Sequence, residues 1–284
     1  MTEPRKALVL GAAGGLGRAF TERLKGRCEV VALGHLELDV TRRNDVFDAV
    51  REHKADLVVD AAGVSDIDLC ETDRWQAYLT NRDGAKHLAM AVAAAGGLLV
   101  YPSSDLVFDG SKQTPYREED PPNPLSIFGD TKLAAELAVM SHAPNHLVVR
   151  TGWLFGPYGR NYVTDLLAWK ETQEVVLGSD DHRGQATYQA DFVDAILELV
   201  KKGRRGLWHV ASEGDATPFE VAQAAYEILK VKRCEVKALR RGTGGRAALR
   251  PRYSVLDCSK LMGAGIQLRP WKAGLRAYLS SVVK

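Results

Sequence analysis

A glycine-rich turn near the start of the chain constrains its fold more than any other feature. The turn, Gly11-Ala-Ala-Gly14-Gly-Leu-Gly17, joins a short apolar run at residues 7–10 to a helix-like segment that ends at Leu24. Glycines permit a tight turn and the close approach of a phosphate, whose charge a helix N-terminus stabilises. A plain strand-to-helix turn is the alternative. The context favours dinucleotide binding, with contacts from Gly11, Ala13, Gly14 and Gly17.

Short apolar runs alternate with helix-length segments through the first half of the chain. The strand-like runs are residues 7–10, 29–33, 56–60, 98–101 and 146–150, and helices are predicted at 44–53 and 81–95. This alternation is typical of βαβ units, whose parallel strands are buried on both faces. The sequence therefore predicts an α/β fold built on a Rossmann-type, doubly wound parallel sheet.

The second half is less regular and predicts a smaller lobe. Helices are expected at residues 191–202 and 218–229, the latter with Thr217 as N-cap, a strand at 207–211 and an exposed loop at 240–252. Ligands of such sheets bind at the carboxyl ends of the strands. We therefore expect a dinucleotide-binding domain at 1–155 and mainly a substrate-binding lobe at 156–284, from which some segments return to the first domain.

Composition excludes several classes of function. Lys+Arg 38 against Asp+Glu 36 leaves a net charge of +2, so nothing points to a nucleic acid or an anionic membrane as partner. The four cysteines are widely separated and predict reduced thiols rather than a metal site. The sequence shows neither a signal peptide nor an apolar run of membrane-spanning length. We expect a cytoplasmic protein.

The residues after the second predicted strand bear on the choice of dinucleotide. A site specific for NAD usually places a carboxylate there for the ribose hydroxyls, whereas this chain has Gly34-His35, with Glu37 and Asp39 later. Arg18 follows the third glycine of the turn. This arrangement leaves room for a 2′-phosphate and favours NADP(H), with NAD(H) as the alternative. Arg18 and His35 could equally be ordinary surface residues.

Several longer motifs together resemble the extended short-chain dehydrogenase/reductases and, more specifically, the dTDP-4-dehydrorhamnose reductase family. The resemblance covers nearly the whole chain. The motifs that carry it are Ser-Ser-Asp-Leu-Val-Phe-Asp-Gly at 103–110, Pro-Asn-Pro-Leu at 122–125, Lys-Leu-Ala-Ala-Glu at 132–136, Arg-Thr-Gly-Trp-Leu-Phe-Gly at 150–156, Arg-Pro-Arg-Tyr-Ser-Val-Leu-Asp at 250–257 and the later Trp271.

The resemblance implies NAD(P)H-dependent reduction of a nucleotide-linked 4-keto-6-deoxy sugar by a Ser/Thr, Tyr and Lys trio. Ser104 would bind the substrate carbonyl, and Lys132 would bind the nicotinamide ribose and lower the pKa of the tyrosine. It further implies cofactor contacts from Asp39, Val40, Ala61, Ala62, Gly63 and Asn81. Substrate contacts are implied for Ser104, Asp105, Val107, Phe108, Trp153, Thr187 and Arg250.

The chain departs from the family pattern at the proton donor. Phe128 occupies the tyrosine position, four residues before Lys132 and so on the same helix face. The segment 179–187 differs too, with His182 in place of a glutamine and Ala186 in place of a proline. A phenyl ring cannot donate a proton, so the chemistry and the sugar specificity are both in question.

Three interpretations of Phe128 stay open. The chain is a reductase slowed by an engineered or recent substitution, since a general acid typically contributes about 10²–10⁴-fold in rate. Alternatively, it is a divergent enzyme that takes its proton from Ser104, Asp105, His182 or a bound water. In the third interpretation it is a non-catalytic NADP-binding regulator that binds a partner protein. A homodimer is a further possibility, because helices on such sheets commonly dimerise.

Overall fold

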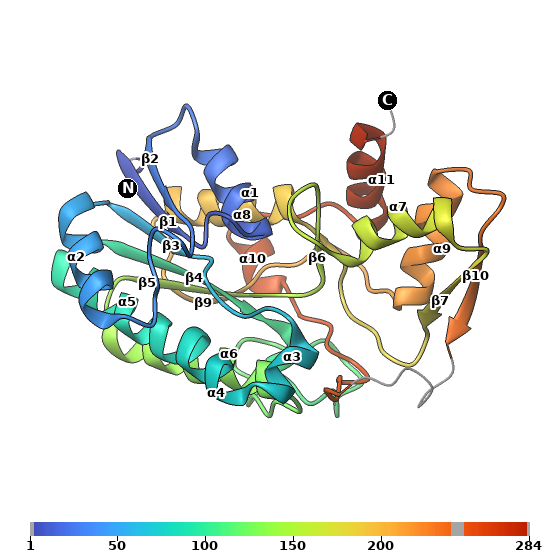
Figure 1. Cartoon of the computed structure of the whole chain (residues 1–284), viewed down its shortest axis with the longest axis horizontal. Coiled ribbons are helices and arrows are strands. Elements are labelled where there is room, and N and C mark those ends of the chain that lie inside the picture. The colour runs from blue at the N-terminus through green and yellow to red at the C-terminus, as the bar shows by residue number, and fades with distance from the viewer. Residues whose placement is uncertain (1–2, 240–246, 283–284) are drawn as a thin grey trace.

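A computed structural model describes residues 3–239 and 247–282, and its centre is a six-stranded parallel sheet (Figure 1). The strand order is β2-β1-β3-β4-β5-β9, as a doubly wound fold requires. The strands are β1 (Lys6–Leu10), β2 (Glu29–Leu33), β3 (Leu57–Asp60), β4 (Leu98–Ser104), β5 (His146–Thr151) and β9 (Gly206–His209). All six predicted strands are confirmed.

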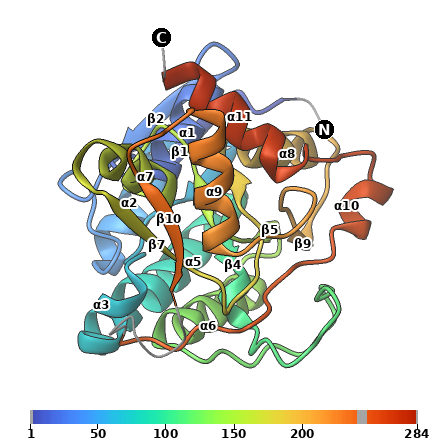
Figure 2. The same cartoon turned by 90° about the vertical axis from the view of Figure 1, so that its right-hand side faces the viewer.

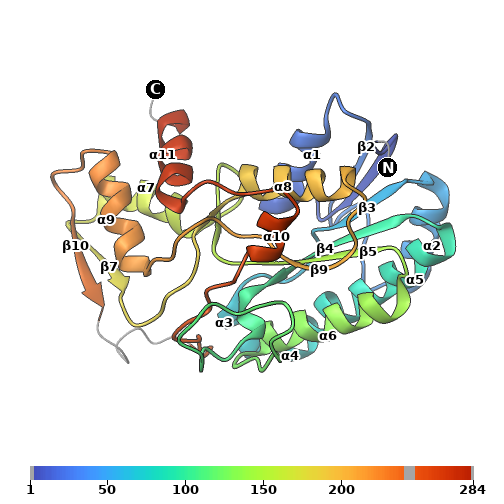
Figure 3. The same cartoon turned by 180° about the vertical axis from the view of Figure 1, so that it is seen from behind.

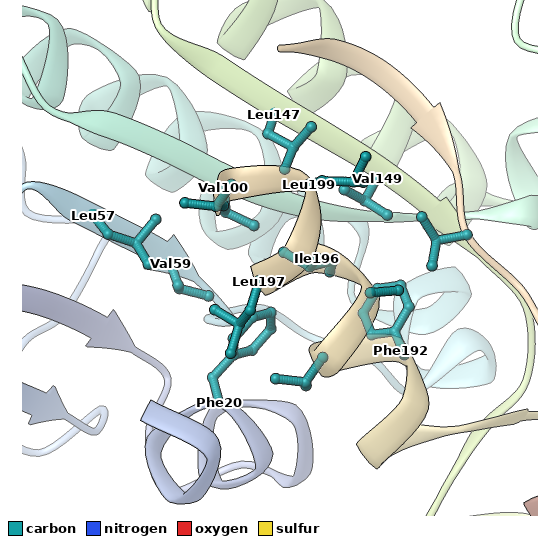
Figure 4. Packing of buried hydrophobic residues seen from close by; sticks show 14 of the residues in the cluster. Phe20, Leu57, Val59, Val100, Leu147, Val149, Phe192, Ile196, Leu197 and Leu199 are labelled. Atoms are coloured by element: carbon teal, nitrogen blue, oxygen red, sulfur yellow. The ribbon is translucent and has the colours of Figure 1, made fainter. Parts of the chain in front are cut away.

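Helices cover both faces of the sheet, so successive strand residues are buried on opposite sides. Figure 4 shows one face, where Val59, Val100 and Val149 pack with Phe20 and Phe192. This face is covered by α1 (Gly15–Leu24), α8 (Gln189–Lys201) and α10 (Ser259–Gly263), and the opposite face by α2 (Arg43–His53), α5 (Ala85–Ala95) and α6 (Ile127–His142).

The smaller lobe lies beside the carboxyl end of the sheet (Figures 1 and 2). It contains the parallel pair β7 (Val175–Ser179) and β10 (Glu235–Leu239), the pair β6 (Leu154–Phe155) and β8 (Thr187–Tyr188), and the helices α7 (Tyr162–Thr172), α9 (Pro218–Ile228) and α11 (Trp271–Val282). The stretch α8–β9 and α10 return to the large domain, as Figure 3 shows.

Two local details differ from the sequence-based expectation. The helix predicted at 81–95 instead begins as a π-helix, Leu79–Gly84, that continues into α5 and follows α3 (Ile67–Thr72) and α4 (Arg74–Tyr78). The loop predicted at 240–252 lies outside the described residues up to 246. In its described part Ala247, Leu249 and Arg252 are exposed, as expected, whereas Ala248 and Pro251 are buried.

The start of α9 follows its sequence closely. Thr217 is the N-cap, as predicted, and its hydroxyl accepts a hydrogen bond from the Glu220 amide at 3.2 Å. The Glu220 carboxylate in turn accepts from the Thr217 amide at 2.8 Å, which completes a capping box. Pro218 occupies the first turn, where its missing amide hydrogen is no loss.

Candidate active site

A cavity of about 870 Å³ lies at the carboxyl ends of β3, β4 and β5, between the sheet and the smaller lobe. Its location matches the crevice in which open parallel sheets bind their ligands. Eleven of the residues predicted for the site line it. They are Gly14, Ala61, Ala62, Gly63, Asn81, Ser104, Asp105, Phe128, Lys132, Trp153 and Arg250.

The glycine-rich turn is fitted closely to the strand beside it. Gly11 has φ 68°, and a Cβ there would lie 2.3 Å from the Ala61 carbonyl oxygen. A Cβ at Gly17 would lie 2.2 Å from the Gly11 carbonyl oxygen. Gly14 is the N-cap of α1 and supplies no side-chain hydrogen bond, so amides of the first turn are left for an anionic ligand. The turn therefore fits a pyrophosphate.

Five further residues predicted to contact the cofactor do not line the cavity: Ala13, Arg18, His35, Asp39 and Val40. Ala13, Arg18 and His35 are exposed, and Val40 packs against Gly84. The Asp39 carboxylate accepts hydrogen bonds from the amide and hydroxyl of Thr41, and these bonds lower its pKa. Glu37 accepts from the Gly34 amide at 2.8 Å. Both carboxylates after β2 are thus engaged by neighbouring groups.

Lys132 lies on α6 beneath the cavity. Its ammonium group donates to the Pro102 carbonyl at 2.7 Å and sits 4.1 Å from the centroid of the Tyr101 ring. Burial lowers the pKa of Lys132 to about 8, and the carboxylates of Asp60 and Glu136 oppose that shift. The side chain is therefore mainly charged near neutral pH, as a group that binds ribose hydroxyls requires.

Phe128 brings its ring to the cavity wall one helical turn before Lys132. The Ser126 hydroxyl caps this end of α6 by accepting from the Gly129 amide at 3.2 Å. Two nearby tyrosines do not replace the missing phenol. Tyr101 is buried beneath Lys132, and Tyr116 stacks on Phe108 at 4.1 Å, and neither lines the cavity.

Two buried carboxyl groups lie at the strand ends. Asp60 is the last residue of β3, and burial raises its pKa to about 6, although Lys132 and the Ala62 amide oppose the shift. Asp105 follows β4 and is 2% exposed, and burial raises its pKa also to about 6. Each is a carboxyl group that can hold a proton near the pH at which cells work.

These two carboxyl groups give the stability of the protein a definite pH dependence. Because their folded-state pKa values lie above the ordinary 3.8, they bind more protons in the folded state between about pH 4 and 6. Their stabilising contribution is present at pH 4 and is lost as the pH rises through 6. The free energy of unfolding of Asp105→Asn, measured in urea, should therefore increase by roughly 2–3 kcal/mol relative to that of wild type between pH 4 and pH 7.

Asp109→Asn is the matched control for that measurement. Hydrogen bonds from Ser111, Asn123 and Tyr116 lower the pKa of Asp109, so its contribution is present above about pH 4 and is lost on acidification. Asp109→Asn should therefore be less stable than wild type by a nearly constant amount from pH 4 to 7. Parallel behaviour of the two variants would contradict the assignment of Asp105.

Three residues predicted to contact substrate are set back from the cavity. Val107 and Phe108 are fully buried in a cluster with Tyr116, Ala211 and Leu256. Thr187 is also fully buried, and its hydroxyl accepts from the Ser212 amide at 3.2 Å. The turn after β4 directs Val107 and Phe108 into the core, and Thr187 lies on β8. None of the three lines the cavity, and their contact with substrate stays a prediction. They support the wall that other residues form.

Arg250 lines the cavity but already has a partner. Its guanidinium makes two hydrogen bonds to the Asp68 carboxylate, at 2.7 and 3.2 Å, and these bonds lower the pKa of Asp68. Asp68 also accepts from the Ala248 amide at 2.9 Å. The contact ties the segment after residue 246 to α3 at the cavity wall.

The divergent segment 179–187 reaches the cavity through His182 and Ala186. The His182 Nδ1 atom lies 3.0 Å from the Ser179 hydroxyl and 3.1 Å from Asp181, and its ring meets Trp153 edge-on at 5.4 Å. Trp153 has φ 28°, a conformation that costs about 1–3 kcal/mol in a residue other than glycine. A strained aromatic residue is thus held against the two substituted positions.

Sequence reasoning missed other residues that line the cavity. Ser103, Thr151 and Gln189 are among them, and the hydroxyls of the first two and the side-chain Oε1 atom of Gln189 are buried with no hydrogen-bond partner among the described residues. Tyr158 lies over the glycine turn, since a Cβ at Gly15 would lie 2.5 Å from its carbonyl oxygen. Only Ser103 and Thr151 carried a signal, as polar residues at strand ends. The other two reach the site through tertiary folding alone.

Across residues 3–239 and 247–282, no group of His, Cys, Asp and Glu side chains is arranged to hold a metal ion. No described helix has the length and apolar character needed to span a membrane.

The sheet order, the glycine turn and the two-lobed cavity define a Rossmann-type α/β protein of the short-chain dehydrogenase/reductase kind. Residues 5–284 match the RmlD substrate binding domain model, and the chain belongs to that family.

Relatives and solved structures agree with this assignment. A dTDP-4-dehydrorhamnose reductase of Streptomyces griseus is 37% identical over 276 residues, which cover 94% of this chain and 91% of that protein. A dTDP-4-keto-6-deoxy-D-glucose reductase of Streptomyces niveus is 34% identical, with 94% of each chain covered. The crystal structure of dTDP-4-dehydrorhamnose reductase from Bacillus anthracis in complex with NADP matches with TM-score 0.95 and 30% identity, over 99% and 100% of the two chains.

Proposed function

We propose that this protein is an NADPH-dependent reductase of a nucleotide-linked 4-keto-6-deoxy sugar. The observation that carries the proposal is the joint placement of Ser104, Lys132 and the glycine turn around one cavity. Relatives that are 34% and 37% identical over almost their whole length are named as reductases of dTDP-linked keto sugars. The cavity of about 870 Å³ lies between the two lobes and is large enough for two ligands to meet there.

The residues present fit a bound dinucleotide. The glycine turn supplies a cradle that a Cβ would fill, and Lys132 supplies a cation for ribose hydroxyls. The unpartnered hydroxyls of Ser103 and Thr151 add hydrogen-bonding capacity at the strand ends. When bound, the dinucleotide supplies a hydride to the sugar ketone. Ser104 would orient the carbonyl by donating a hydrogen bond to its oxygen.

NADPH is proposed over NADH because of the environment after β2. Hydrogen bonds from Thr41 and Gly34 already occupy one oxygen each of the Asp39 and Glu37 carboxylates, which leaves fewer acceptor sites for the hydroxyls of an adenine ribose. Arg18, which follows the glycine turn, and His35, which follows β2, are both exposed and can approach a 2′-phosphate. The relative from Bacillus anthracis, whose structure contains NADP, supports the same choice. A cytoplasmic location and a homodimer stay predictions from the sequence.

A direct assay tests the proposal. We expect NADPH to raise the melting temperature more than NADH does, because a ligand at 100 times its Kd stabilises by about 2.7 kcal/mol. With dTDP-4-dehydrorhamnose present, the wild-type protein should oxidise NADPH measurably, followed by its absorbance. A matched control without sugar gives the background rate.

The second candidate function is a non-catalytic, NADP-binding regulator. The observation in its favour is the phenyl ring of Phe128 at the cavity wall, where the family has a phenol. Thermal stabilisation by NADPH without turnover of any 4-keto sugar, in wild type and in Phe128→Tyr alike, would support this candidate. Failure of both dinucleotides to stabilise the protein would contradict both functions.

A further inference from the structure

The cavity contains a hydrogen-bonded pair that can supply the proton that Phe128 cannot. The Ser104 hydroxyl donates to Asp105 Oδ1 at 3.1 Å and accepts from the Leu106 amide at 3.1 Å. Asp105 Oδ2 accepts from the Ser254 hydroxyl at 2.5 Å. Ser104, Asp105 and Ser254 all line the cavity, so the network reaches the place where a substrate would bind.

The hydrogen bonds of Ser104 limit what it can do. A hydroxyl has one hydrogen, and here that hydrogen is directed to the Asp105 carboxylate. Ser104 can donate to a substrate carbonyl only when its hydrogen is no longer bonded to the Asp105 carboxylate. A protonated Asp105 meets this condition, because its own hydrogen then points to the Ser104 oxygen. The protonation of Asp105 and the direction of the Ser104 hydroxyl are therefore coupled.

We propose that Asp105 is the proton source of the reduction and that Ser104 relays its proton to the substrate. This inference rests on the proposed reductase function. The ketone carbon gains a hydride from NADPH as the carbonyl π bond breaks, and NADP⁺ forms. The carbonyl oxygen takes the Ser104 proton, and Ser104 takes the proton of Asp105. The Asp105 carboxylate then recovers a proton from water in the cavity, so the net consumption is one NADPH and one proton.

Burial of Asp105 favours the protonated form that this role requires, and the hydrogen bonds from Ser254 and Ser104 oppose that effect in part. Asp105 is 2% exposed, and the backbone of Gly152 leaves room for it, because a Cβ there would lie 3.2 Å from Asp105 Oδ2. Burial raises its pKa to about 6. His182 lines the same cavity and contacts Ser179 and Asp181, and charged groups on neighbouring elements also have partners. These pairs are Lys132 with Pro102, Glu136 with Arg150, Arg183 with Asp215 and Glu220, and Arg250 with Asp68.

Other groups that carry protons in the cavity are less well placed. The Tyr162 hydroxyl donates to the Pro218 carbonyl at 3.1 Å. The Tyr158 carbonyl lies against Gly15, on the side of the glycine turn. Asp60 neighbours Lys132 and accepts from the Ala62 amide at 3.2 Å. Asp105, in contrast, accepts a hydrogen bond directly from the Ser104 hydroxyl at 3.1 Å.

The first test is Asp105→Asn, assayed with NADPH and dTDP-4-dehydrorhamnose from pH 5 to 9. We expect kcat at pH 6 to fall by about 10²-fold, the usual contribution of a general acid, with little change in KM. Wild-type kcat should decrease as the pH rises above about 6, because the protonated form is the active one. The variant should lose that decrease while keeping its thermal stabilisation by NADPH. Wild-type kcat and an unchanged pH profile in Asp105→Asn would overturn the relay.

Rescue separates the relay from a structural role of Asp105. In the double variant Phe128→Tyr/Asp105→Asn, the phenol replaces the relay, so turnover should return to within about tenfold of Phe128→Tyr alone. His182→Gln and Asp60→Asn are the comparison variants, and a pH profile lost in either but kept in Asp105→Asn would overturn the proposal. So would an active Phe128→Tyr beside an inactive wild type. Inactivity of Phe128→Tyr on every 4-keto sugar would instead reject the reductase function itself.

Discussion

Phe128→Tyr is expected to raise kcat for reduction of a dTDP-linked 4-keto-6-deoxy sugar by about 10²-fold over wild type. General acids typically contribute 10²–10⁴-fold, and the relay through Ser104 places the expected gain at the lower end of that range. Phe128 lines the cavity one turn before Lys132, so a hydroxyl on its ring would reach the same space. The measurement is NADPH oxidation at saturating substrate.

The new phenol would also have a cation close to it. Lys132 keeps most of its charge near neutral pH, and a neighbouring positive charge lowers the pKa of a tyrosine. Phe128→Leu is the control, because it changes the packing at the same site without adding a proton donor, and it should not exceed wild-type kcat. An equal gain in both variants would show that shape, rather than proton donation, limits the rate.

Loss of the buried ion pair between Glu136 and Arg150 is expected to have the largest effect on stability. The two side chains are 0% and 3% exposed and share hydrogen bonds of 2.7 to 3.2 Å between α6 and β5. Removing one partner leaves the other charge buried and uncompensated, which typically costs about 3–5 kcal/mol. Glu136→Leu should therefore lower the free energy of unfolding in urea by that amount.

Two further variants show whether burial is the cause of this effect. Glu136→Leu/Arg150→Met removes both charges at similar side-chain volume. It should recover most of the lost stability, because neither charge then has to be transferred from water to the protein interior. Asp48→Asn breaks the exposed pair with Arg51 and should change stability little. If Glu136→Leu were as stable as wild type, the pair would not hold α6 in place.

The ion pair also bears on the site, because α6 carries both Phe128 and Lys132. Glu136 lies one turn after Lys132 and opposes the burial that lowers the pKa of that lysine. The Arg150 guanidinium lies 5.0 Å from the centroid of the Phe108 ring, in the cluster behind the cavity wall. One buried contact therefore fixes the helix and supports the wall that faces it.

The parallel sheet could be predicted because its signals are local. Runs such as residues 29–33 and 146–150 are apolar, short and separated by helical segments, and each became a strand. The glycine turn was equally readable, since Gly11 and Gly17 have no room for a Cβ. The positions of Ser104, Phe128 and Lys132 were found through resemblance, and the fold brings all three to one cavity.

The rest depended on contacts between distant segments. Nothing near Ser254 in the sequence shows that its hydroxyl reaches Asp105, which lies 149 residues away. Val107 and Phe108 follow a site residue in sequence, yet the short 3₁₀ turn Asp105–Val107 directs them into the core. Tyr158 and Gln189 join the site only when the smaller lobe meets the sheet. A sequence pattern indicates periodicity and turn residues, but it does not indicate contacts between segments that lie far apart in the chain.

The length of the π-helix Leu79–Gly84 is explained by the position of Asn81 at the cavity and not by packing in the core. Its hydrogen bonds span one residue more than those of an α-helix. The segment therefore contains one residue more than an α-helix that joined the same two ends would contain. Within it, the Asn81 amide bonds the backbone of Val64 at 2.8 and 3.1 Å and the Thr131 hydroxyl at 3.0 Å. An α-helix one residue shorter would leave α5 in register with its neighbours but turn Asn81 by about 100° away from Val64. We therefore expect single-residue insertions and deletions in this helix to displace Asn81 at the cavity wall.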